Sequence, residues 1–549
     1  MIEELTAASG LLQDALDRYL KICSAMRGSC TTISGSKGLP QELLSRVEHE
    51  TNLFPTYESM LYQAKSALGY TRNSPPLAPI NALPYEVLSR IFGFVAAAEP
   101  YVLGEQHKVP PRTGIVLPKY PDLLLLVCSY WRDIALHSHW LWSHIDLSSD
   151  YRLSARLISR AHVYATRAKH VPLYIHLDIA YDLSGKWENV STPLIQFVTS
   201  VAERTGVLVL DMGAIGSSCD EFFVTLLEIF LRCCTPGQLT QLILPHVRLL
   251  TYPNSYRYIK AKDRSSLAHR RFLSDDCVFL DILPSRLEDI LLQLTTLRLD
   301  GLYFPWDSQA YRGLTDLCLS PGRVMPAEIS VSDLVSIMKA SPKLRRLAIG
   351  ITITEPFSFG TSVEPVTLGY LETLIYAVQE GGKFDSLLQL ITPGPGPLSL
   401  SLARDYYTVL VDFDHIFKNN QIGSFFARSN VPVLSASGLQ GIAQVMDLLN
   451  ANRNTHTFSL DNFWNYQGHD YQNLPQATKT LDTLFVQRSR ISVADILSLV
   501  QAYHIRKVIL SSCQDPTGNP YNLKNDIIPT LQKALSENSV APNTSISYS

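Results

Sequence analysis

The side chains that could carry out catalysis are scattered through this chain, and no catalytic spacing brings them together. The sequence contains no H-E-x-x-H zinc pair, no G-x-S-x-G nucleophile turn, no lysine in a phosphate-binding loop and no cysteine placed with a histidine as its base. His137 and His139 could both ligate a metal, but no third ligand lies near them in the sequence. Acidic pairs such as Asp275 and Asp276 are typical of solvated surfaces, because general acid-base catalysis needs an enclosing pocket. We therefore expect no catalytic residues, no metal and no cofactor.

Side chains suited to recognition gather in two polar stretches. From Tyr252 to Arg271, tyrosines alternate with arginines and lysines, a pattern that can stack on and neutralise single-stranded nucleic acid. The stretch is short and single, so it favours a solvated loop or a docking site for an acidic protein, and we expect no nucleic acid partner. Trp464 and Tyr466 lie among polar residues, where exposed aromatic side chains often anchor a protein interface. Packing of these aromatics against the chain's own fold is the equal alternative.

The composition describes a globular protein with room for several hydrophobic cores. The chain has 549 residues, of which 46% are hydrophobic and 18% are charged, and this length suits roughly two to four domains. Its formal net charge is -3 and its isoelectric point is about 6.5. No overall charge therefore draws the chain to nucleic acid or to an anionic membrane.

The expected location is intracellular, either cytoplasmic or nuclear. Glu3 and Glu4 occupy the place where a secretory signal carries positive charge, and no apolar run reaches the ~18 residues that span a bilayer. The nine cysteines are odd in number and never form C-x-x-C, which favours reduced thiols over a disulfide framework or a zinc site. We expect no membrane partner.

Two apolar stretches require helices to position them. Between residues 81 and 95, hydrophobic residues recur at helical spacing behind Pro84, and Glu86 lies in the first turn, where the helix dipole favours an acid. Between residues 123 and 147, the residues expected on one helical face are Leu124, Val127, Cys128, Trp131, Ile134 and Ala135. Two short helices cannot bury this much apolar surface. Either a partner covers part of it, or the stretch is an ordinary helical hairpin that contributes to the chain's own core.

The ordered motif in these stretches resembles an F-box. It runs from Leu83 to Leu147, about 65 of the 549 residues, and is most similar to the F-box-like domains of large fungal families. The resemblance implies a helical motif that docks on the Skp-type adaptor of a cullin complex, a ubiquitin ligase, while the rest of the chain holds a substrate protein. The adaptor-binding residues that it implies are Leu83, Pro84, Glu86, Val87, Leu88, Ile91, Phe92, Val127, Cys128, Trp131, Ile134, Leu141 and Trp142. A proline-bearing insertion at 96–120, where compact F-boxes have a shorter turn, bears on the affinity for the adaptor.

Beyond residue 147, leucine-like residues recur in the form LxxLxL. The clearest copies are 239–244, 294–299, 314–319, 344–349, 371–376, 481–486 and 505–510, and weaker copies begin at Val171, Val207, Val431 and Thr455. Several neighbouring copies are about 20 to 30 residues apart, as expected when each repeat is one strand with a helical return. Helical spacing at 220–231, 331–340, 441–450 and 493–503 supplies such returns.

The predicted fold class is α/β. An N-terminal helical region with F-box helices is followed by an irregular leucine-rich-repeat-like solenoid with a curved parallel sheet. A doubly wound α/β domain would also alternate strands and helices, but no glycine-rich phosphate turn follows a strand here. The expected layout is 1–75 N-terminal helical region, 76–148 F-box-like domain, 149–540 leucine-rich-repeat-like domain and 541–549 disordered tail. The N-terminal region is expected to form a helical hairpin packed on the F-box, with a coiled-coil dimerisation arm as the alternative.

These features predict a substrate-recognition adaptor of an SCF-type cullin ubiquitin ligase that binds an unknown protein substrate and is not itself an enzyme. Holding the target beside a loaded ubiquitin-conjugating enzyme would make the transfer quasi-intramolecular. One alternative is a non-catalytic repeat scaffold for protein-protein interaction without ubiquitin transfer. A second alternative is an unrecognised α/β enzyme built from residues distant in the sequence.

The target is expected on the concave face of the repeats, which is the extended binding surface of repeat proteins. That face would be formed by the strand positions that alternate with the core leucines. The target-binding candidates are Arg298, Asp300, Arg346, Phe485, Gln487, Lys507 and Ile509, with Trp464 and Tyr466 as a second contact. Arginine and aromatic side chains are the types that dominate interface energies.

Overall fold

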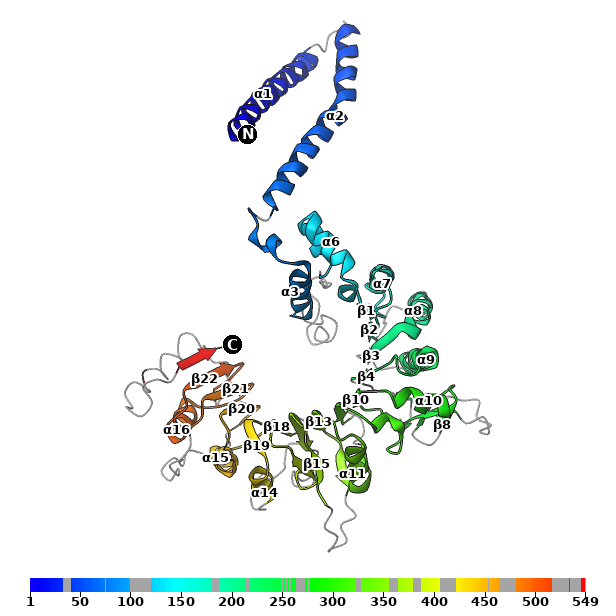
Figure 1. The fold of residues 1–549 in the computed structure, drawn as a ribbon, viewed down its shortest axis with the longest axis vertical. Helices are drawn as coiled ribbons and strands as arrows, with labels where there is room; N and C mark the ends of the chain where they lie inside the picture. The colour runs from blue at the N-terminus through cyan, green and yellow to red at the C-terminus, as the bar shows by residue number, and fades with distance from the viewer. Residues whose placement is uncertain are drawn as a thin grey trace. The chain divides into compact units, whose positions relative to one another are not determined.

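The structure, a computed structural model, describes most of the chain (Figure 1). The described residues are 1–32, 41–74, 76–98, 120–179, 187–212, 217–245, 247, 250–251, 254–255, 258–262, 272–273, 277–321, 327–354, 364–378, 387–404, 421–452, 454–464, 480–515, 533 and 545–548. The chain divides into two compact units. The first comprises Met1–Ile91 with Asp122–Ile134, and the second comprises Phe92–Pro121 with Ala135–Ser549.

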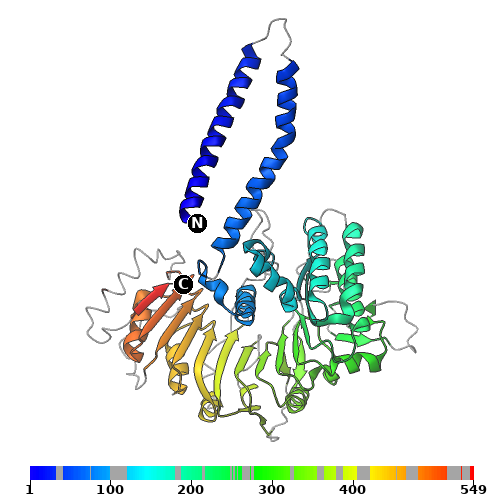
Figure 2. The same ribbon diagram turned by 45° about the horizontal axis from the view of Figure 1, so that its top comes forward.

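Two long helices begin the first unit. Helix α1 (Ile2–Thr32) and helix α2 (Gln41–Arg72) run in opposite directions, as Figure 2 shows. They meet at Tyr19, whose hydroxyl donates to Glu50 Oε2 at 3.1 Å and whose ring meets the edge of Tyr57. The expected hairpin is therefore present. Its expected packing on the F-box-like helices is wrong for α2, however, because this helix has no buried residue.

The F-box-like segment forms short helices. After the 3-10 turn η1 (Pro79–Ala82), helix α3 (Tyr85–Ala98) follows Pro84, whose fixed φ suits the start of a helix. The predicted second helix is interrupted: α5 (Leu124–Val127) ends at Cys128, which is extended at φ -160°, and α6 (Ser129–His137) begins anew. The prediction of one continuous apolar face was thus wrong, and Val127 is exposed while Ile134 is buried.

The second unit is mixed α/β and is built on a 14-stranded sheet. The strands of this sheet are β1 (His144–Ser148), β2 (Leu173–Asp178), β3 (Thr205–Asp211), β4 (Gln241–Leu244), β10 (Thr296–Asp300), β11 (Asp316–Ser320), β13 (Arg346–Ile349), β16 (Thr373–Val378), β18 (Pro397–Arg404), β19 (Asn430–Ser437), β20 (Thr457–Asp461), β21 (Thr483–Gln487), β22 (Lys507–Ser511) and β23 (Ser545–Tyr548). Every neighbouring pair is parallel, and the spatial order follows the chain order without a reversal. A doubly wound sheet reverses its strand order, so that alternative is excluded.

Helices return the chain from one strand to the next. They are α7 (Ser154–Ala168), α8 (Trp187–Val201), α9 (Ser217–Cys233), α10 (Pro284–Leu291), α11 (Val331–Ala340), α14 (Gln421–Ala427), α15 (Ile442–Ala451) and α16 (Val493–Tyr503). In Figure 1 the strands of this unit follow a curved path, and these helices lie along its outer side. The helices predicted at 331–340 and 493–503 have the observed bounds, and Ser492 caps α16 in a capping box with Asp495.

Minor elements occupy the connections of the second unit. The 3-10 turns are η3 (His139–Trp142), η4 (Ala202–Arg204) and η5 (Gln309–Tyr311). The small sheets pair β5 (Leu250–Thr251) with β6 (Asn254–Ser255), β7 (Tyr258–Ala261) and β8 (Phe272–Leu273) with β9 (Cys277–Leu280), β12 (Glu328–Ser330) with β14 (Thr352–Thr354), and β15 (Val366–Leu368) with β17 (Ile391–Pro393). No helix in the described part of the chain combines the length and the hydropathy needed to cross a bilayer.

The core is a set of apolar rows that run across the strands. In register, Leu242 pairs with Leu297, Leu297 with Leu317, and Leu317 with Leu347, and the next apolar row runs two residues further along each strand. The ten positions predicted to point inward are all buried: Leu297, Leu299, Leu317, Leu319, Leu347, Ile349, Leu484, Val486, Val508 and Leu510. The prediction of parallel strands in one sheet is therefore confirmed.

One of the weaker predicted repeats, the copy that begins at Val171, has its register wrong by one residue. The sequence pattern placed Tyr174 in the core, whereas the buried row of β2 passes through Leu173, Ile175 and Leu177. Because side chains alternate between the two faces of a strand, a shift of one residue moves the whole strand pattern to the other face. Tyr174 and His176, two polar aromatic residues on either side of Ile175, obscured the alternation.

Two predicted domain boundaries were also wrong. Strand β1 lies within the predicted F-box-like range 76–148, yet its residues pair with β2, so the sheet begins at His144. The predicted disordered tail contains β23, which pairs in parallel with β22. Serine alternates with Ile546 and Tyr548 in this strand, the period-2 pattern of a strand with one apolar face.

Removing one side chain from the buried rows should destabilise the sheet strongly. Leu317 lies on the central strand β11 with none of its surface exposed. Leu317→Ala should lower the free energy of unfolding by about 2 to 5 kcal/mol, the cost of lost burial and a residual cavity. Urea denaturation followed by circular dichroism measures this change. Leu292→Ala, the same change at a half-exposed leucine, is the control and should cost much less, so equal losses in the two variants would contradict the proposed rows.

Candidate binding sites

The sequence-predicted target residues fall into two groups on the sheet. Arg298 and Asp300 lie on β10 and Arg346 on β13, whereas Phe485, Gln487, Lys507 and Ile509 lie on β21 and β22. At roughly 4.8 Å between neighbouring strands, the two groups are on the order of 30 Å apart along the sheet. One small ligand cannot reach both, but an extended protein segment can.

The first group is less positive than the sequence suggests. Arg298 Nη2 lies 2.5 Å from Asp316 Oδ2, and Arg298 Nε also donates to Asp316 Oδ1 at 3.3 Å. Arg346 Nε is 4.0 Å from the same carboxylate on the strand between them. The hydrogen bonds that Arg298 donates to Asp316 raise the pKa of Arg298 above its ordinary value, against the opposing effect of burial. Because one carboxylate partly neutralises both cations, a target must compete with Asp316 for them.

The second group is more apolar. Phe485 is 37% exposed and pairs in register with half-buried Ile509, while Lys507 is exposed at the start of β22. Gln487 ends β21, and the chain turns away from the sheet directly after it. An exposed phenylalanine beside an isoleucine is suited to bury an apolar side chain of a partner.

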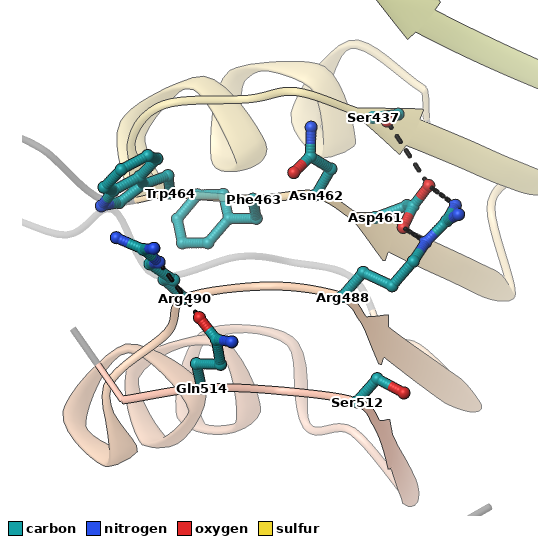
Figure 3. A pocket seen from close by; sticks show the side chains of 9 residues that line it. All are labelled: Ser437, Asp461, Asn462, Phe463, Trp464, Arg488, Arg490, Ser512 and Gln514. Carbon is teal, nitrogen blue, oxygen red and sulfur yellow. Dashed lines mark hydrogen bonds and ion pairs between the residues drawn. The ribbon is translucent and has the colours of Figure 1, made fainter. Parts of the chain in front are cut away.

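A pocket of about 550 Å³ opens next to this second group, where strands β19 to β22 end (Figure 3). Its lining residues are Ser437, Asp461, Asn462, Phe463, Trp464, Arg488, Arg490, Ser512 and Gln514. Of the predicted contacts, Trp464 therefore lies in a pocket, whereas Tyr466 falls outside the described residues. No sequence pattern indicates the other lining side chains as a site.

A row of left-handed residues builds the pocket. Directly after the four strands, Gly438, Asn462, Arg488 and Ser512 have φ of 81°, 47°, 47° and 51°. Three of them donate their N–H across to the next strand end, for instance Arg488 N to Ser511 O at 3.0 Å. Left-handed backbone costs a non-glycine residue roughly 1 to 2 kcal/mol, and these hydrogen bonds help to offset that cost. The left-handed residue turns the chain out of the sheet in the same way after each of the four strands. The segments that follow therefore lie side by side and form one wall of the pocket.

One arginine of the pocket is neutralised and the other is not. Arg488 forms a two-point ion pair with Asp461, which Ser437 also contacts. Hydrogen bonding to Asp461 raises the pKa of Arg488. Arg490 instead lies with its guanidinium carbon 4.1 Å from the ring centre of Trp464 and donates through Nε to Gln514 Oε1 at 3.2 Å. Within the part of the chain that the structure describes, Arg490 forms no ion pair with a carboxylate.

This arrangement is suited to bind an oxygen anion. The indole face of Trp464 and the amide of Gln514 hold Arg490 in one orientation, which reduces the entropy lost when it binds a ligand. A fixed guanidinium offers two parallel N–H donors to a carboxylate or a phosphate. Because the ion pair of Arg488 and Asp461 is neutral, Arg490 gives the pocket a net positive charge.

The pocket could not be located from the sequence, although a weak signal exists. Arg488 and Arg490 flank a serine immediately after a repeat core, but two alternating arginines are common on solvated surfaces. Their partners lie on other repeats, 24 to 27 positions away, and the in-register pairing of β21 with β20 and with β22 brings them together. The basic-aromatic stretch 252–271, by contrast, falls largely outside the described residues, although Tyr258 meets the edge of Trp306.

A partly buried cluster of ionisable residues lies at the first strands of the sheet. His144 and His176 contact Asp146 Oδ1 at 3.2 Å and 3.1 Å. Burial opposes the ionisation of Asp146, but the hydrogen bonds from both histidines outweigh it and hold the pKa of Asp146 below its ordinary value. Burial lowers the pKa of His176, but Asp146 and the nearby Asp211 and Asp178 raise it overall.

The described residues hold no group of three or more histidine, cysteine or acidic side chains placed to bind a metal ion. The two histidines and Asp146 are therefore best described as an ion-paired part of the sheet. His137 and His139, the pair singled out in the sequence, lie at the end of α6 and in η3.

The residues that the F-box resemblance implies as adaptor-binding fall into three sets: buried, half-buried and exposed. Leu88, Phe92, Ile134, Leu141 and Trp142 are buried and belong to the hydrophobic core, which corrects their expected role as contact residues. Leu83, Ile91, Cys128 and Trp131 are half-buried, and Pro84, Glu86, Val87 and Val127 are exposed. An adaptor can reach only the last two sets without unfolding the helices.

Comparison with known proteins does not identify the chain. No protein-family model matches it, and no curated protein matches it.

The ion pair of His176 with Asp146 predicts a pH dependence of stability. The raised pKa of His176 means that its contribution is complete below the ordinary histidine value of 6.5 and is lost as the pH rises through the raised value. The lowered pKa of Asp146 means that its contribution is present above 3.8 and is lost as the pH falls below it. The pair therefore stabilises most between these two pH values.

His176→Gln should remove this contribution. The variant should lose roughly 2 kcal/mol of unfolding free energy near pH 5.5 and progressively less as the pH is raised toward 9, because the contribution of His176 is lost as the pH rises through its raised pKa. Denaturant titrations at the two pH values measure the difference. Exposed His170→Gln is the control and should change little at either pH. A loss at His176 that is the same at both pH values would rule out a charged pair.

Proposed function

We propose that this protein is the substrate-recognition subunit of an SCF-type cullin ubiquitin ligase. In this proposal the segment 77–142 is an F-box-like module that docks on a Skp-type adaptor, and the curved sheet is a leucine-rich-repeat-like solenoid that holds a protein target. The protein would act inside the cell as a non-catalytic bridge. The observation that carries the proposal is that the motif helices leave several apolar side chains exposed. Hydrogen bonds between other residues of the motif form a frame that fixes the positions of these helices.

The frame centres on Asn81. This residue is buried, accepts a hydrogen bond from Trp131 Nε1 at 2.7 Å and donates Nδ2 to Asn73 O at 2.6 Å. Tyr130 Oη further donates to Leu83 O at 3.3 Å. Satisfied polar groups of this kind fix one arrangement of the helices, because losing either partner would leave the other group buried without a hydrogen bond. The position of α6 relative to the Leu83–Pro84 turn is therefore fixed.

The exposed side chains on this frame are large and apolar. Val87 is 41% exposed, Val127 50% and Leu126 75%, and Leu77 and Leu123 are exposed as well. Burying apolar surface is worth about 25 cal/mol per Å², so covering such residues gives a substantial driving force for association. Soluble surfaces normally carry such residues singly, and several within one short motif favour a docking surface for a helical partner.

The sheet supports the repeat part of the proposal. Strands β19 to β22 repeat one pattern: two buried apolar residues at alternate positions of the strand, a left-handed residue directly after it, and then a buried residue, which is Leu439, Phe463, Ser489 or Cys513. The form LxxLxL followed by a further buried residue resembles a leucine-rich repeat, in which each unit buries its apolar face against its neighbours. The segments that connect successive strands differ in length, so in this proposal the repeats have diverged from a regular leucine-rich repeat.

The mechanism is one of effective concentration. An adaptor bound at one unit and a target bound at the other become parts of the same complex, so ubiquitin transfer to the target no longer requires a separate encounter. The chain's own residues need only bind. In the proposed target site, Arg490 would engage a carboxylate or another oxygen anion of the target while Phe485 and Ile509 cover an apolar side chain beside it.

The adaptor contact predicts the effect of placing charge on the exposed motif residues. Val87→Asp with Val127→Asp should weaken binding to a purified Skp-type adaptor by about 100-fold or more, because both aspartates would be desolvated on binding. Calorimetry measures the affinity, and circular dichroism checks that the fold is intact. Arg156→Asp, at an exposed position of α7, is the matched control and should bind normally.

Normal binding by the double variant would place the adaptor elsewhere. A wild-type chain that does not bind the adaptor would instead support the alternative of a repeat scaffold without ubiquitin transfer.

The target site predicts a separate effect. Arg490→Ala should lower target capture about tenfold while leaving adaptor binding unchanged, since a charge-assisted hydrogen bond contributes roughly 1.5 to 3 kcal/mol. Quantitative co-precipitation with mass spectrometry, scored for partners other than the adaptor complex, measures the loss. Arg345→Ala removes an exposed arginine that pairs with Glu372 and serves as the control. An unaltered partner list for Arg490→Ala would exclude the pocket as a target site.

A further inference from the structure

Helices α1 and α2 present more apolar surface than a pair of helices can bury. On α1, Leu5, Leu11, Leu12, Leu16, Leu20 and Ile22 are between 41% and 72% exposed. On α2, Leu44, Val47, Phe54, Met60, Leu61 and Leu68 are between 41% and 62% exposed. At 1.5 Å per residue, helices of 31 and 32 residues are each roughly 47 Å long, so this surface extends along a substantial length.

Apolar side chains stay exposed even on the side of α1 that faces α2. Leu5, Leu12, Leu16 and Tyr19 recur at intervals of seven, four and three residues and so share one side of α1. Tyr19 on this side contacts Glu50 and Tyr57 of α2, yet Leu12 and Leu16 remain more than 40% exposed. One neighbouring helix covers only part of such a row, whereas the helices of a four-helix bundle cover it from two sides.

The charges of the two helices indicate what the additional neighbours are. The first half of α1 carries Glu3, Glu4, Asp14 and Asp17 without lysine or arginine, and its second half carries Arg18, Lys21 and Arg27 without an acid. Helix α2 repeats the pattern, with Glu42, Glu48, Glu50 and Glu58 against Arg46 in its first part, and Lys65 and Arg72 without an acid in its second.

A helix that is acidic at its start and basic at its end is complementary to an antiparallel copy of itself. Within one chain, this pattern already matches the acidic start of α1 to the basic end of α2. If the helices of a second copy ran antiparallel to these, acidic helix starts would again lie beside basic helix ends at both ends of the interface. Self-complementarity is the requirement of a two-fold symmetric interface, in which the same surface is used on both subunits.

We propose that α1 and α2 dimerise the protein by forming an antiparallel four-helix bundle with the same helices of a second copy. The apolar rows provide the driving force, and the charge pattern sets the direction of the neighbouring helices. This proposal concerns helices α1 and α2 alone and does not rest on the proposed function. A dimer would also carry two copies of whatever the second unit binds.

Molar mass measured by light scattering of the full-length protein tests the proposal. The wild-type chain should have twice the monomer mass of 61.3 kDa at micromolar concentration. Leu12→Glu with Leu16→Glu should raise the dissociation constant of the dimer more than about tenfold, because four carboxylates would enter the bundle core. Gln13→Glu with Ser24→Glu adds the same charge at exposed polar positions of α1 and should leave the dimer intact.

A second variant tests the charge pattern without touching the apolar rows. Glu3→Lys with Glu4→Lys should weaken the dimer several-fold at low ionic strength and have little effect in about 1 M salt, where charges are screened beyond roughly 3 Å. A wild-type protein that stays monomeric at up to about 100 μM would overturn the proposal. So would a dimer that survives Leu12→Glu with Leu16→Glu, because the interface would then lie elsewhere.

Discussion

The in-register stacking of parallel strands is the constraint on which the rest of the second unit depends. Each strand places two apolar residues on the same side, and each residue meets its equivalent on the strand before and the strand after. A strand in this sheet therefore has no isolated core of its own, because its buried surface exists only between neighbours. The same register places the left-handed residues after β19 to β22 side by side, so the wall of the pocket and the hydrophobic core follow from one pairing pattern.

Sequence patterns predicted the parts of the fold that depend on periodicity. The LxxLxL copies located the strands, since Leu297, Leu317 and Leu347 are buried as expected, and helical spacing located α11 and α16. The pattern failed where polar residues interrupt it, as at Tyr174. It also could not show the break at Cys128, because the apolar residues on both sides still fit one helical period.

The candidate site depends on information that a pattern does not contain. The sequence indicated Trp464 through its residue type, but the stacking of Arg490 on its ring and the pairing of Arg488 with Asp461 arise between separate repeats. It also overstated Arg298, because the neutralising Asp316 lies on the adjacent strand. Residue type alone could therefore identify side chains able to bind, whereas their available charge was set by partners that only the folded sheet brings near.

The connection between β4 and β10 shows how this architecture accommodates change. Residues 245–295 separate the two strands in the chain, yet Leu242 and Leu297 pair in the same register as any directly consecutive repeats. Loop closure becomes only slowly less favourable as a connection lengthens, so an insertion there adds little strain to the sheet. A connection of this fold can therefore gain or lose a whole segment while the pairing of the strands on either side of it stays the same.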